Sequence, residues 1–284
     1  MGEVGEVVVS AATGVLGPVL AWQGRRVWQA MPPMVPAKGD PCGVALPATT
    51  LAPPAAADGS ACSAVLLVGD STVAGCGSPT HVEAFGGQLG AALAAQLGRA
   101  VSWHAVGRIG VTARRAIDEL EPDVAAAAAI TPVDVALIAL GVNDTLRRRS
   151  TRAYITALAD VVTMVRRHTG PVPVVLVGVP PVGSFPLLPQ PLGTVLGLRA
   201  RLLDRAAARW AARRPGVVHV PAPIDRRTLA ALTSADGFHP SPAGYARLAG
   251  VLAPVCANLL MSPDRMDQPQ SGDGPAIRER GSGR

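Results

Sequence analysis

The fold is decided by the stretch Val65-Leu66-Leu67-Val68-Gly69-Asp70-Ser71, an apolar run that ends at a glycine and two small polar residues. A continuous apolar run is typical of a parallel strand that is covered on both faces. Gly69 permits a sharp turn, and Asp70 and Ser71 are common at turns and helix starts. The stretch therefore predicts a buried strand with the hydroxyl of Ser71 at its carboxyl end, where open α/β sheets place their ligands.

From residue 64 onward, strand-like apolar runs alternate with stretches of helical periodicity. This alternation predicts a parallel sheet with helices on both faces, joined by right-handed crossovers. We expect an α/β fold, a three-layer α/β/α sandwich with a five-stranded, flavodoxin-like parallel sheet. The expected strands are 65–68, 101–106, 133–140, 172–179 and 217–220, and the expected helices are 83–97, 112–120, 153–168, 195–213 and 242–260.

The sequence divides into four expected segments. Residues 61–261 form the α/β domain, and the polar residues 262–284 form a disordered tail. Residues 31–60 are rich in Pro and Ala and are expected to be a linker, and residues 1–30 form an apolar N-terminal segment.

The N-terminal segment contains an apolar run, residues 7–22, that is followed by Arg25 and Arg26. A spanning helix needs about 20 apolar residues, so the run is short for that role. Two interpretations stay open, a helix packed on the domain and a segment in peripheral contact with a membrane. Glu3 and Glu6 precede the run, where a secretory signal carries positive charge, so a cytoplasmic or membrane-associated location is favoured over a secreted one.

Composition bears on both the core and the possible binding partners. The chain is 49% hydrophobic but only 3% aromatic, so its core must consist of Ala, Val and Leu. The net charge is +6, but the arginines are spread in pairs and triples without interleaved aromatics, which favours a solvated surface over a nucleic-acid site. The four cysteines show no metal-ligand spacing, so neither a metal nor another cofactor is expected, and a Cys42–Cys62 disulfide is left open.

Further polar clusters follow the later strands or precede the last helix. They are Gly107-Arg108-Ile109-Gly110-Val111-Thr112, then Gly141-Val142-Asn143-Asp144, and finally Asp236-Gly237-Phe238-His239-Pro240-Ser241. Each cluster alone could be a structural turn or a helix cap. Since the carboxyl ends of parallel strands meet at one edge of a sheet, we expect the clusters to lie near Ser71.

The four blocks, taken in order, resemble the SGNH hydrolase superfamily, also called the GDSL esterase/lipase family. The resemblance covers roughly residues 64–260. It implies that Ser71 is a nucleophile, that His239 is its general base, and that Asp236 orients the imidazole. It also implies that the backbone N–H groups of Ser71 and Gly110 and the side-chain amide of Asn143 stabilise the oxyanion. Thr72 stands where many relatives have leucine, and the usual asparagine near Gly110 is missing.

The function expected from this resemblance is hydrolysis of carboxylic esters through an acyl-enzyme. The scarcity of aromatic residues argues against a long polysaccharide platform, so short-to-medium acyl chains are expected. The partner is then a small-molecule or lipid ester. The apolar loop 180–192 should overhang the same end of the sheet, so Phe185, Leu187 and Leu188 are expected to shape an acyl pocket. Two alternatives stay open: an acyltransferase or deacetylase acting on a cell-envelope glycan or lipid, and a non-catalytic binding protein on the same fold.

Overall fold

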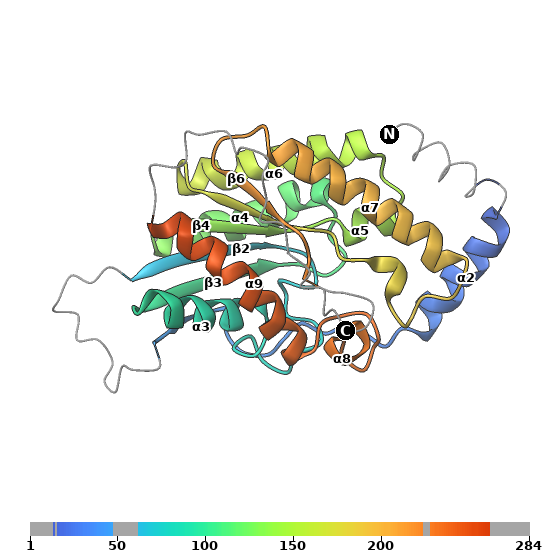
Figure 1. Ribbon diagram of the computed structural model, residues 1–284, viewed down its shortest axis with the longest axis horizontal. Coiled ribbons are helices and arrows are strands. Elements are labelled where there is room, and N and C mark those ends of the chain that lie inside the picture. The colour runs from blue at the N-terminus through green and yellow to red at the C-terminus, as the bar shows by residue number, and fades with distance from the viewer. Residues whose placement is uncertain (1–13, 15, 48–61, 224–227, 262–284) are drawn as a thin grey trace, which may run out of the picture.

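The predicted strand that precedes Ser71 lies in the middle of the sheet. The computed structural model describes residues 14, 16–47, 62–223 and 228–261. Within these ranges, six strands form one sheet in the order β1-β3-β2-β4-β5-β6 (Figure 1). The strands are β1 (Cys42–Ala45), β2 (Ser63–Gly69), β3 (Val101–Gly107), β4 (Val135–Ala139), β5 (Val174–Val177) and β6 (Val217–Val220).

The five predicted strands are present, and each is parallel to its neighbours among the five. The sixth strand, β1, was not predicted and pairs antiparallel with β3 at the edge of the sheet. It lies inside the stretch 31–60 that the sequence predicts to be a linker. β1 has only four residues in a Pro/Ala-rich context, so it carries almost no local strand signal. It is held by pairing with β3, where Gly43 lies opposite Trp103.

Helices cover both faces of the sheet (Figure 1). One face packs against α3 and α9, and the other packs against α4, α6 and α7. Successive side chains of β2 point to opposite faces of the sheet. Val65 and Leu67 belong to the core under α3 and α9, whereas Leu66 and Val68 belong to the core under α4, α6 and α7, so every residue of this run must be apolar. The helices are α2 (Gly17–Ala30), α3 (Phe85–Leu97), α4 (Ala113–Ile130), α5 (Val142–Leu146), α6 (Thr151–Thr169), α7 (Leu192–Ala211), α8 (Leu229–Leu232) and α9 (Pro242–Met261), with a 3₁₀ turn η1 (Val182–Ser184).

The five predicted helices are also present, with shifted ends. α4 extends to Ile130, past the predicted end at residue 120, and includes Pro122. The helix continues because Val124 and Ala127 keep the apolar spacing and are buried. The short helices α5 and α8 were not predicted, because a segment of four or five residues is too short to show helical periodicity in the sequence.

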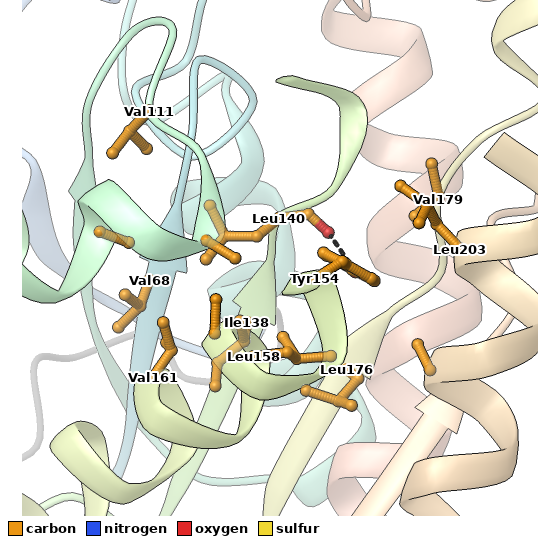
Figure 2. Close-up of a cluster of buried hydrophobic side chains, with 14 of the residues drawn as sticks. Val68, Val111, Ile138, Leu140, Tyr154, Leu158, Val161, Leu176, Val179 and Leu203 are labelled. Atoms are coloured by element: carbon orange, nitrogen blue, oxygen red, sulfur yellow. Dashed lines mark hydrogen bonds between the residues drawn. The ribbon is translucent and has the colours of Figure 1, made fainter. Parts of the chain in front are cut away.

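Figure 2 shows part of the core between the sheet and α6. Aliphatic side chains such as Val68 and Ile138 from the strands meet Leu158 and Val161 from the helix (Figure 2). Tyr154 is buried among them, and its hydroxyl donates a hydrogen bond to the carbonyl of Leu140 at 3.0 Å, directly after β4. The core thereby fixes the end of β4, from which the Gly141–Asp144 cluster begins.

The N-terminal helix α2 packs on the domain beside the start of α7 (Figure 1). Leu20 joins the core, and Gln23 is also buried. Residues 1–13 and 15, which include much of the predicted apolar run, lie outside the described residues, as do 48–61 and the predicted tail 262–284. Membrane contact through residues 7–22 stays a prediction.

α9 is, in the described part of the chain, the one helix that is long and apolar enough to cross a membrane. Its apolar side chains are largely accounted for by packing against α3. Tyr245, Leu252 and Cys256 are fully buried there. Cys42 and Cys62 are both exposed, free thiols, so the disulfide that the sequence left open is not formed in this structure.

Candidate active site

Ser71 lies directly after β2, at the carboxyl end of the sheet. The backbone turns sharply there, because the N–H groups of Val73 and Ala74 both donate to the carbonyl of Asp70, at 3.1 and 3.0 Å. The N–H of Cys76 donates to the carbonyl of Ser71 at 3.0 Å. Ser71 is only 7% exposed. The turn thus holds one hydroxyl in a fixed, largely buried position.

The loop before α9 brings a histidine and a carboxylate to this hydroxyl. His239 Nε2 lies 3.0 Å from Ser71 Oγ, and His239 Nδ1 lies 2.6 Å from Asp236 Oδ2. Asp236 Oδ1 accepts three further hydrogen bonds, from the hydroxyl of Ser234 and the N–H groups of Phe238 and His239, at 2.7, 2.8 and 2.9 Å. One carboxylate therefore folds its own loop and orients the imidazole.

The electrostatics of this loop keep Asp236 ionised. Burial by itself raises the pKa of the Asp236 carboxyl, but the hydrogen bonds from His239, Phe238 and Ser234 outweigh burial and hold the pKa below its usual value. A carboxylate that remains charged favours the tautomer with a proton on Nδ1, and leaves Nε2 free to accept the proton of Ser71.

Gly110 lies in the turn between β3 and α4, and Asn143 lies in α5, just after β4. Gly110 has a φ of +75°, a left-handed conformation that explains the glycine, and a Cβ there would meet open space. Among the described residues, neither the N–H of Ser71 nor that of Gly110 has a hydrogen-bond acceptor. Asn143 is the second residue of α5, four positions after the end of β4. All three predicted oxyanion donors therefore belong to segments that leave the same edge of the sheet.

Two aspartates, Asp70 and Asp144, connect these segments. Asp70 Oδ1 accepts the N–H of Thr72 at 3.0 Å, and its Oδ2 accepts the side-chain amide of Asn143 at 3.2 Å. Asp144 accepts the N–H of Ala113 at 3.0 Å, which links the start of α4, just after the Gly110 turn, to α5. Burial raises the pKa of Asp144, and it raises the pKa of Asp70 to about 6.

Two hollows meet at Ser71. A small cavity of about 70 Å³ is lined by Ser71, His239 and Phe185 among others. A larger cavity of about 510 Å³, the groove, is lined by Ser71, Gly110 and Asn143 and by residues of α2 and α7. The hydroxyl can therefore be reached by a bound molecule, with polar groups concentrated at one point of a mostly apolar surface.

The loop predicted to shape an acyl pocket is divided between these hollows. Phe185 lines the small cavity and Leu188 lines the groove. Leu187 is half-buried and packs near Gly237 of the histidine loop, and it lines neither hollow. The sequence analysis did not predict that α2 lines the groove. This contribution depends on the packing of α2 against the domain and is marked by no local motif.

The remaining histidines lie away from Ser71. His168 and His219 contact carboxylates, Glu121 at 3.0 Å and Asp204 at 2.9 Å. His81 and His104 line a separate cavity of about 490 Å³, and burial lowers the pKa of both. Among the described residues, no group of three or more His, Cys, Asp or Glu side chains could hold a metal ion.

Comparison with known proteins adds an independent observation. The chain is 30% identical over 194 residues to the GDSL-like esterase Rv1075c of Mycobacterium tuberculosis, and the match spans 66% of this chain but only 60% of that protein. The fold resembles the lipase Lip_vut3 from a goat rumen metagenome, with a TM-score of 0.57, 17% identity, and coverage of 70% of this chain and 99% of that one. It also resembles a carbohydrate esterase family 3 protein from Talaromyces cellulolyticus, with a TM-score of 0.51, 16% identity, and coverage of 70% and 99%.

The sequence profile of the GDSL-like lipase/acylhydrolase family matches residues 67–247. This range is well over half of the chain and includes all four motif blocks. Both the family resemblance and the α/β fold expected from the sequence are confirmed. The protein belongs to the GDSL-like lipase/acylhydrolase family.

Proposed function

We propose that the protein is a serine hydrolase that cleaves carboxylic esters through an acyl-enzyme intermediate. The observation that carries the proposal is the hydrogen-bonded chain in which His239 lies 3.0 Å from Ser71 Oγ and 2.6 Å from Asp236. The first distance allows His239 to accept the proton of Ser71, and the second allows Asp236 to orient the imidazole through a hydrogen bond. The family membership agrees with this chemistry.

In the first half of the proposed reaction, Ser71 Oγ attacks the ester carbonyl while His239 Nε2 accepts the hydroxyl proton. The carbonyl π electrons move to the oxygen and form a tetrahedral oxyanion. His239 then gives the proton to the ester oxygen, the bond from the carbonyl carbon to that oxygen breaks, and the alcohol leaves. In the second half, water repeats these steps on acyl-Ser71, so the acid is released and the hydroxyl of Ser71 is restored.

The oxyanion is assigned to the N–H groups of Ser71 and Gly110 and to the amide of Asn143. An amide nitrogen carries two N–H groups, so Asn143 can donate one to Asp70 and keep one for the oxyanion. Loss of one such donor typically lowers turnover by about 10²–10³-fold. The donors are neutral, so none of them competes with His239 for a proton.

Hydrolysis of p-nitrophenyl esters by wild type, Ser71→Ala and Ser102→Ala tests this proposal. Ser102 is a buried serine near the amino end of β3, away from the carboxyl edge, and serves as the matched control. We expect Ser71→Ala to lose at least about 10³-fold in kcat, with Ser102→Ala close to wild type. Equal rates for wild type and Ser71→Ala would refute the assignment. Adding an alcohol acceptor and identifying the products separates hydrolysis from acyl transfer.

A further inference from the structure

We propose that the groove between α2 and α7 is the acyl-binding subsite and that the natural substrate is an ester of an aliphatic acid longer than acetate. This inference rests on the proposed function and deepens it. It assigns a role to the N-terminal helix, which lies outside the residues that match the family profile.

The groove has the size and the lining of a small-molecule site. Its volume of about 510 Å³ lies within the range of about 300–1,000 Å³ that ligand sites usually occupy. Its long walls are mostly apolar. They include Leu20, Ala21, Gly24 and Val27 from α2 and Val195 and Leu196 from α7.

The residues that line the groove indicate which part of an ester enters it. Gly110 and Asn143 line the groove, whereas His239 lines the small cavity, and Ser71 lines both. His239 must protonate the departing alcohol oxygen, so the alcohol part faces His239. The acyl chain, on the opposite side of the carbonyl carbon, then points along the groove.

α2 is fixed to the domain in the position that completes this wall. Gln23 is buried, and its side chain makes two hydrogen bonds to the loop that leads into α7. Its Nε2 donates to the carbonyl of Gln190 at 2.6 Å, and its Oε1 accepts the N–H of Leu192 at 3.1 Å. A buried amide that is satisfied at both ends holds α2 against α7 in a specific register. The wall is therefore a built part of the structure.

The chemistry of the walls favours an aliphatic chain over a sugar. Away from Ser71 and the oxyanion donors, the polar side chains of the groove are Arg147, Arg148 and Arg199. A sugar ring would leave most of its hydroxyl groups against apolar surface without hydrogen-bond partners. An alkyl chain instead gains from each methylene removed from water, and the expected gain is about fourfold in kcat/KM for each methylene that the groove buries.

A variant of Gly24 tests the groove directly. Gly24 lines it within α2, and a Cβ at this position would meet open space, so a larger side chain can be introduced there without an immediate clash. Gly24→Phe should fill the groove. The matched control is Gln29→Phe, which places the same ring at an exposed position of α2 that does not line the groove. Both variants are compared with wild type on p-nitrophenyl acetate, butyrate, octanoate and decanoate.

We expect the wild-type kcat/KM to rise with chain length. Gly24→Phe should lower the ratio of the decanoate value to the acetate value at least tenfold, while Gln29→Phe keeps the wild-type ratio. A wild type that prefers acetate, or the same ratio in both variants, overturns the inference. Calorimetric titration of decanoate into Ser71→Ala and Gly24→Phe/Ser71→Ala provides a readout without turnover, with binding expected only to the first. If decanoate binds but wild type hydrolyses no ester, the proposed function is refuted while the acyl-binding groove stands. If wild type hydrolyses esters but Gly24→Phe leaves the chain-length ratio unchanged, only the present inference is refuted.

Discussion

The side-chain amide of Asn143 donates a hydrogen bond to Asp70 over 3.2 Å, across 73 positions of sequence. This bond joins the turn that carries the nucleophile to the segment that carries a proposed oxyanion donor. Asp70 is almost completely buried, with 3% exposed. We interpret Asp70 as a positioning residue that acts on the reaction through Asn143.

Asp70→Asn should lower kcat about tenfold with little change in KM. The new amide can still accept the N–H of Thr72, but its second polar atom is then a donor that faces the donor of Asn143. The oxyanion contact is thereby weakened, and that contact matters most in the transition state. Steady-state kinetics on one ester measures both constants.

A double-mutant cycle separates this role from a general structural one. Asn143→Ala should lose about 10²–10³-fold in kcat, and Asp70→Asn/Asn143→Ala should be no slower than Asn143→Ala. If the two losses multiply, Asp70 acts by a route other than Asn143.

The buried carboxyl of Asp70 should also make stability depend on pH. Burial raises its pKa to about 6 from 3.8, so between these values the folded state binds more protons than the unfolded state. Stability therefore falls as the pH rises through this window. Asp70→Asn lacks this dependence. Relative to wild type, the free energy of unfolding of Asp70→Asn should increase by about 3 kcal/mol between about pH 4 and pH 7. A constant difference in urea denaturation across that range would show that Asp70 ionises in the folded state as readily as in the unfolded one.

Gly141→Ala should destabilise the fold by at least about 2 kcal/mol. Gly141 has a φ of +136°, and a Cβ there would lie 2.6 Å from Val179 Cγ2 and 3.0 Å from the hydroxyl of Tyr154. Gly250→Ala is the control, because Gly250 lies in α9 with open space around its Cβ and should gain up to about 1 kcal/mol. Chemical denaturation of both variants checks the sign of each change, and a neutral Gly141→Ala would mean that this turn relaxes freely.

The parts of the fold and of the site that could be predicted are those that short stretches of the sequence mark by their own pattern. The strand before Ser71 is an unbroken apolar run, and the blocks around Gly110, Asn143 and His239 are short polar clusters next to strand or helix ends. Since parallel strands share one carboxyl edge, the topology alone brings such clusters together. The structure places Ser71, His239 and Asp236 within hydrogen-bonding distance in series. The family resemblance rather than the topology pointed to Asp236 and His239, because these two residues lie between α8 and α9 and do not follow a strand directly.

The parts that were not predictable depend on pairs of residues far apart in the chain. β1 exists through its pairing with β3, about 60 positions away, and its four residues carry no pattern of their own. The groove wall depends on Gln23 meeting Gln190, which is 167 positions distant. No period or spacing in either segment marks these contacts. Segments such as α2, which composition assigns to a separate region, can therefore complete a site only after tertiary packing.

The most direct measurement of the central claim is covalent labelling with a fluorophosphonate probe, read by intact mass and peptide mapping. We predict one adduct per chain, located on Ser71, with labelling lost in Ser71→Ala and strongly slowed in His239→Ala but retained in Ser102→Ala. Absence of labelling in wild type, or an adduct on a residue other than Ser71, would contradict the assignment of Ser71 as an activated nucleophile.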